Sequence, residues 1–155
     1  MSNIKFYIKY TYNMKFDIEK YLGEWFEIAR IKNSFQPNMT NVKAQYILNQ
    51  DKSIQVINSG VINTVIVEIN GTAITTEEDN LLKVSFFPNI YSDYKILYID
   101  EDYQYAVVGG ENKNYLWILS RTPHIDDIIL YKLIDIAKGK GYETDNLILT
   151  EQNYE

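Results

Sequence analysis

Residues 16–30 read FDIEKYLGEWFEIAR, and from Trp25 onward the chain becomes a series of short segments rich in β-branched and aromatic residues. Clusters of Asn, Asp, Gly and Lys interrupt the series about every ten residues as far as Leu119, which is typical of an antiparallel all-β domain. The pattern predicts about eight strands. They are Trp25–Ile31, Val42–Leu48, Ile54–Val61, Val65–Thr75, Leu81–Phe87, Tyr94–Ile99, Tyr103–Val108 and Tyr115–Ser120.

Asn70-Gly71 lies inside the fourth of these segments and has two interpretations. It forms either a tight hairpin turn or a bulge that bends one long strand, because glycine accepts the positive φ that both require. We favour the bend.

The segment after Pro123 differs from the rest of the chain because it predicts one amphipathic helix. Asp126 and Asp127 suit a helix start, and apolar residues then recur at helical spacing: Ile129, Leu130, Leu133, Ile136 and Ala137. Lys138 suits the carboxyl end, and Gly139 or Gly141 supplies the left-handed residue that ends the helix. Asn146–Thr150 is then expected as a short final strand.

The composition argues against several classes of function. The 155 residues are 46% hydrophobic, enough for one domain, and the net charge of −6 comes from scattered acids, so nucleic acid is not an expected partner. With no cysteine and a single histidine, His124, we expect no catalytic site, no metal site and no cofactor. No apolar run reaches membrane-spanning length, and residues 1–10 lack the continuous apolar stretch of a signal peptide, so we expect a cytoplasmic or otherwise non-exported protein.

Eight strands form a barrel with room inside for packed side chains or one small ligand. Alternate residues point inward. The predicted inward face is apolar and aromatic, and consists of Ala44, Tyr46, Leu48, Val56, Asn58, Leu82, Val84, Phe86, Tyr94, Ile96, Tyr98, Tyr105, Val107, Tyr115, Trp117 and Leu119. Glu27 shares the parity of Trp25, which would place a carboxylate inside, and Asn58 needs a polar partner there. This composition is typical of a lipid pocket.

Three motifs in order resemble the signatures of the lipocalin family. They are Gly23-Glu24-Trp25 within residues 16–30, residues 98–103 (YIDEDY) and residues 115–123 (YLWILSRTP). Their wording is most similar to the bacterial lipocalin and apolipoprotein D branch. The resemblance implies an eight-stranded antiparallel up-and-down β-barrel, with one C-terminal α-helix packed outside and a short final strand. It divides the chain into an N-terminal extension, residues 1–15, and a lipocalin domain, residues 16–155.

The resemblance also implies roles for individual residues. Gly23, Trp25 and Arg121 are structural, with the Arg121 guanidinium on the Trp25 indole at the narrow end of the barrel. Tyr46, Asn58, Phe86 and Trp117 match positions that line the ligand cavity. Together with Tyr98 and Glu27 from the inward face, they form the predicted ligand-binding set.

The implied function is to bind, store or transport a fatty acid or lysophospholipid, without enzymatic activity and sometimes as a homodimer. The alternative is an interaction or structural protein whose cavity is filled by its own side chains. Residues 87–91 (FPNIY), a strand connection with apolar residues, would then serve as a contact surface or a cavity rim.

Overall fold

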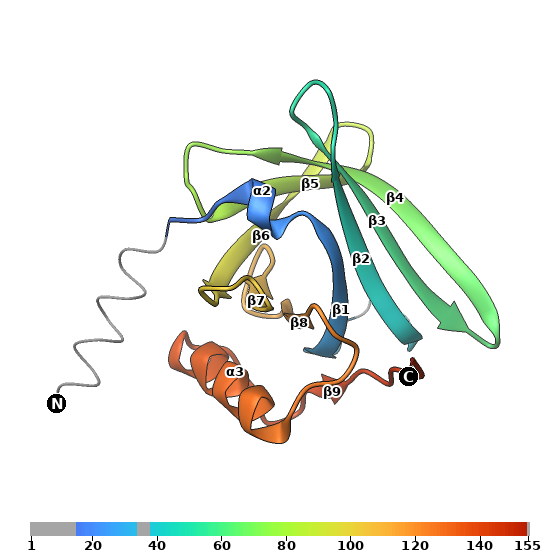
Figure 1. Ribbon diagram of the computed structural model, residues 1–155, viewed down its shortest axis with the longest axis vertical. Helices are drawn as coiled ribbons and strands as arrows, with labels where there is room; N and C mark the ends of the chain where they lie inside the picture. The colour runs from blue at the N-terminus through green and yellow to red at the C-terminus, as the bar shows by residue number, and fades with distance from the viewer. Residues whose placement is uncertain (1–14, 34–37, 155) are drawn as a thin grey trace, which may run out of the picture.

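The computed structural model describes residues 15–33 and 38–154, which form a closed antiparallel barrel with a helix outside (Figure 1). The strand order is β2-β3-β4-β5-β6-β7-β8-β1-β9, and pairing between β1 and β2 closes the ring. This confirms the predicted up-and-down barrel. The elements are α2 (Ile18–Tyr21), β1 (Gly23–Arg30), β2 (Thr40–Leu48), β3 (Ile54–Ile62), β4 (Val65–Thr75), β5 (Leu81–Phe87), β6 (Ile90–Ile99), β7 (Tyr105–Gly109), β8 (Leu116–Ser120), α3 (Asp127–Gly139) and β9 (Ile148–Leu149).

Strand β4 is continuous, as the favoured interpretation of Asn70-Gly71 requires, but the reason differs from the one expected. Gly71 pairs with Val56 without a register shift, and its φ lies outside the left-handed region. A Cβ on Gly71 would lie 2.6 Å from Cδ1 of Phe86 and 2.6 Å from the Ser85 carbonyl oxygen. Glycine is therefore needed here because β5 approaches closely.

The predicted helix is α3, which lies against the outside of β7 and β8 (Figure 1). Its buried face, Leu133 and Ala137, joins Ile118 and Val107 of the barrel wall in a second apolar cluster. Gly141, with φ +91°, supplies the left-handed residue after the helix. Asp126 occupies the N-cap position, although its side chain makes no capping hydrogen bond there.

The C-terminal segment fills the wall where β1 and β2 separate. These two strands pair only over residues 23–26 and 43–46, while β9 pairs with the far end of β1. The Gln152 amide then bridges the gap, because its Nε2 donates to the carbonyls of Glu27 and Val42, each at 2.9 Å. The final strand is thus shorter than predicted, but the segment around it completes the barrel.

One short helix was not predicted, and one predicted segment lies almost wholly outside the described residues. Helix α2 has only four residues, and its N-cap is Asp17, whose carboxylate accepts from the Glu19 backbone N–H. The predicted N-terminal extension, residues 1–15, falls outside the described residues apart from Lys15. No helix in the described part of the chain is long and apolar enough to cross a membrane.

Candidate functional site

The interior of the barrel is the candidate site, and one apolar cluster fills its closed end. Its buried members come from α2, from each of the strands β1 to β8 and from the β6–β7 turn: Tyr21, Trp25, Tyr46, Ile54, Val56, Ala73, Val84, Ile96, Ile99, Tyr103, Ala106, Val108 and Leu119. Ala44, Phe86, Tyr94 and Trp117 pack against this cluster but are only partly buried. The inner wall therefore keeps accessible apolar surface beyond the packed end.

The Arg121 guanidinium lies on the Trp25 indole, as the resemblance implies, at the end of the barrel where α2 leads into β1. The guanidinium carbon of Arg121 lies 3.8 Å from the centroid of the Trp25 ring, which is fully buried. Four hydrogen bonds of 2.9–3.0 Å hold the guanidinium on backbone carbonyls: those of Lys20, Leu22, Glu24 and Tyr103. Arg121 thus ties α2, β1 and the β6–β7 turn together on the outer side of the indole. Gly23 has φ +101°, and a Cβ there would lie 3.3 Å from Nη1 of Arg121.

Three tyrosines meet inside the barrel and form what we call the tyrosine triad: Tyr21 of α2, Tyr46 of β2 and Tyr94 of β6. The Tyr94 hydroxyl lies 2.5 Å from that of Tyr21 and 2.8 Å from that of Tyr46. Burial raises the pKa of Tyr46 to about 12 and raises the pKa values of Tyr21 and Tyr94 well above the usual range. The three phenols are therefore neutral at physiological pH.

Four predicted ligand-binding residues lie on the inner side of the barrel. Tyr46 belongs to the buried cluster, and Phe86 and Trp117 pack against it. Asn58 lies opposite Ala44, one inward position from the Tyr46–Val56 pair and farther from the closed end. In the described part of the chain the Asn58 amide is half-buried and makes no side-chain hydrogen bond, so it is open to water or a ligand. The ligand-binding role of these residues stays a prediction.

The prediction that Tyr98 faces the interior is wrong. The β6–β7 pairing shifts register between Ile96 and Tyr98, so Ile96 and Ile99 face inward while Tyr98 packs with the cluster under α3. Tyr105 and Val107 of the expected inward face also belong to that outer cluster. A bulge adds one residue to the strand and reverses the alternation beyond it.

Glu27 faces inward, but as half of an ion pair. It lies opposite Leu119 of the inner cluster and is buried, with Oε2 3.1 Å from Nη1 of Arg30. The Thr150 hydroxyl donates to the same oxygen at 2.5 Å. Both charges are thus neutralised within the wall. The sequence analysis missed Arg30 as the partner of Glu27, because a register shift in β1 changes which residues face inward after Glu27.

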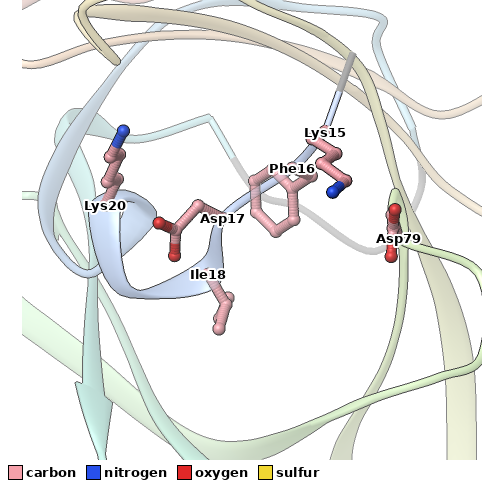
Figure 2. Close-up of a pocket in the computed structure, with 6 residues that line it drawn as sticks. All are labelled: Lys15, Phe16, Asp17, Ile18, Lys20 and Asp79. Atoms are coloured by element: carbon pink, nitrogen blue, oxygen red, sulfur yellow. The ribbon is translucent and has the colours of Figure 1, made fainter. Parts of the chain in front are cut away.

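A separate hollow of about 510 Å³ lies beside the segment that leads into α2 (Figure 2). Lys15, Asp17, Lys20 and Asp79 surround it together with Phe16 and Ile18. Figure 2 shows charged side chains of both signs spread around an open depression. None of the predicted ligand-binding residues lines this hollow, and its charged, open lining does not suit a hydrophobic ligand.

The described residues do not suggest a metal site. No group of three His, Cys, Asp or Glu side chains in residues 15–33 and 38–154 is arranged to hold a metal ion. His124 lies at the surface, with Nε2 2.7 Å from the Tyr154 carbonyl oxygen. The site that the geometry supports is the barrel interior.

Comparison with known proteins agrees with this geometry. Residues 16–152 match the family described as the lipocalin-like domain. The chain is 39% identical over 142 residues to the outer membrane lipoprotein Blc of Vibrio cholerae, covering 88% of this chain and 83% of the relative. It is 31% identical over 150 residues to mouse apolipoprotein D, covering 88% and 77%. Lobster apocrustacyanin A1 superposes with a TM-score of 0.72 at 19% identity, covering 97% of this chain and 85% of that one, which supports the fold.

These relatives correct one prediction. The expectation of a cytoplasmic or otherwise non-exported protein is contradicted, because similar proteins at 36–39% identity are outer membrane lipoproteins. The expectation came from the composition of residues 1–10, which does not decide the compartment.

Proposed function

The chain belongs to the lipocalin family, and we propose that it binds and carries one fatty acid or lysophospholipid molecule inside the barrel. The family supports the coarser function, binding or transport of a small hydrophobic ligand without enzymatic activity. The observation that carries the finer proposal is the partly exposed inner wall of Ala44, Phe86 and Trp117 above the packed closed end. Such a wall suits an aliphatic chain, which needs apolar area rather than precise polar contacts.

The proposed contact residues are Tyr46, Asn58, Phe86 and Trp117. Phe86 and Trp117 supply apolar area, and the Asn58 amide and Tyr46 hydroxyl supply polar atoms within the same wall. Glu27 is not proposed as a ligand contact because its carboxylate already binds Arg30 and Thr150.

Tryptophan fluorescence tests this proposal. Only Trp25 and Trp117 report, and Trp25 is fully buried at the closed end, so the signal change on titration with a fatty acid or a lysophospholipid should come from Trp117. We expect saturation at one ligand per chain, loss of the signal in Trp117→Phe, and retained binding of that variant by calorimetry. Absence of binding by both methods would refute the proposal.

A second function, contact with another protein through the surface, is favoured by an apolar rim. The rim comprises Val65 and Ile66 of β4 and Phe87, Ile90 and Tyr91 around the β5–β6 turn, all at least half exposed. In an up-and-down barrel these two turns lie at the same end, and Figure 1 shows the β3–β4 hairpin reaching beyond the other strands. Native mass spectrometry separates the functions: lipid bound to the purified protein supports the carrier, and a ligand-free homodimer supports the contact surface.

A further inference from the structure

One hydroxyl hydrogen of the tyrosine triad has no acceptor within the triad. Three hydroxyl groups carry three hydrogens, and the two bonds centred on Tyr94 use two of them. Within the described residues, no other hydrogen-bond acceptor reaches the three oxygens. Whichever direction the bonds run, one hydroxyl hydrogen has no acceptor among the described residues.

Tyr94 is the least buried member of the triad. Tyr21 and Tyr46 are buried, whereas Tyr94 is only partly buried. The Asn58 amide is one inward position away from Tyr46 on the neighbouring strand. A polar floor thus lies at the inner end of an otherwise apolar wall.

The charged groups near the triad are already engaged by other partners. Arg121 lies behind the Trp25 ring and donates to four backbone carbonyls. On β1, Glu27 and Arg30 bind each other at 3.1 Å. The described inward-facing residues of β2 to β8 carry no charged side chain. Arg121 keeps its charge, but the Trp25 ring lies between it and the interior. An ionised ligand group at the triad would therefore be buried without a cation in contact, which is unfavourable.

We propose that the tyrosine triad holds the uncharged polar end of a single-chain lipid, so that a fatty acid enters carboxyl first and is bound in its protonated form. This inference rests on the proposed function and chooses between its ligands: a fatty acid or fatty alcohol fits the floor, and the charged head of a lysophospholipid does not. The bound carboxyl accepts the spare hydrogen and can donate its own to the Asn58 oxygen.

The proposal predicts proton uptake on binding. Free dodecanoic acid is almost fully ionised at pH 6, since the pKa values of carboxyl groups in water lie at about 4. If only the neutral acid binds, its apparent Kd rises about tenfold per pH unit between pH 6 and 8.5. The Kd of 1-dodecanol, measured by the same calorimetry, should not change over that range. An equal Kd for dodecanoic acid at pH 6 and pH 8 would overturn the proposal, because the carboxylate would then remain in water at the mouth.

A variant pair locates the effect. Replacing Tyr21, Tyr46 and Tyr94 together with phenylalanine removes every hydroxyl donor of the triad and should weaken 1-dodecanol binding about three- to tenfold, the loss of one hydrogen bond. Tyr98→Phe, on the same strand as Tyr94 but packed under α3, should bind within about twofold of wild type. An unchanged affinity in the folded triple variant would overturn the proposal. Dodecane that binds as tightly as 1-dodecanol would overturn it too, because the spare hydrogen would then belong to a buried water. If the triple variant does not fold, the wild-type pH series decides. Failure of dodecanoic acid, 1-dodecanol and a lysophospholipid to bind would refute the proposed function itself.

Discussion

Replacing Arg121 with alanine tests whether the closed end is structural. The change removes four hydrogen bonds to backbone carbonyls and the contact with the Trp25 ring at 3.8 Å. Water can replace the two bonds at the exposed carbonyls of Lys20 and Glu24. The two part-buried bonds, at about 1 kcal/mol each, and the cation–π contact, at about 0.5 to 1 kcal/mol, give a loss of about 2 to 3 kcal/mol.

For a domain of this size, that loss corresponds to a decrease in Tm of about 5 to 10 °C. Differential scanning calorimetry measures it, and Arg121→Lys is the matched control. Lysine keeps the charge but not the planar fork that reaches several carbonyls, so its Tm should lie between those of Arg121→Ala and wild type. Ligand stoichiometry should stay at one per chain, because Trp25 separates the guanidinium from the interior. A variant as stable as wild type, or a stable variant that binds no ligand, would refute this reasoning.

Three further predictions concern the wall and its floor. Gly71→Ala should destabilise the barrel by about 1 to 3 kcal/mol in urea unfolding, because its Cβ would overlap Phe86, whereas Gly139→Ala, with no atom within 4 Å of the added Cβ, should not; equal effects would contradict this. Glu27→Gln should lower the free energy of unfolding by about 3 kcal/mol, because it removes the carboxylate that pairs with the buried Arg30 charge. An unchanged Tm would contradict this prediction. The contribution of Tyr46 to the free energy of unfolding should be constant up to pH 10 and fall as pH rises to about 12. The reason is that its raised pKa means that the folded state holds the phenol proton more tightly than the unfolded chain does. Absorbance at alkaline pH that shows every tyrosine ionising near pH 10 in the folded protein would contradict this.

Local sequence patterns were sufficient for most of the fold. The bounds of β4 and β5 agree with the predicted segments, and the apolar spacing after Asp127 predicted α3. Other boundaries were missed for local reasons. Strand β6 begins at Ile90 rather than Tyr94, because exposed residues near a turn show no clear alternation. Helix α2 spans about one turn, which is too short to show a helical period.

The candidate site was predicted only in part, because its polar contacts join distant parts of the chain. The Tyr21 hydroxyl binds that of Tyr94, 73 residues later, and Thr150 binds Glu27 from 123 residues away. Alternation can place Tyr94 on the inner face, but it cannot show which hydroxyl it meets. Strict alternation along the strand also placed the Glu27 carboxylate inside without a partner. The register shift that turns Arg30 inward could not be recognised from the amino-acid composition of the strand.

The register shifts that defeat simple alternation have a structural role in docking α3. In β1 the shift places Ile28 and Ala29 both on the outer side, and in β6 it does the same for Leu97 and Tyr98. Strict alternation would offer α3 only one residue of each pair. Doubling the outward apolar residues gives the barrel a surface that can bury the helix, while Trp25 and Ile96 still face inward. Consecutive apolar residues in a strand beside a helix therefore indicate a bulge, and the inward face of such a strand has to be counted separately on each side of it.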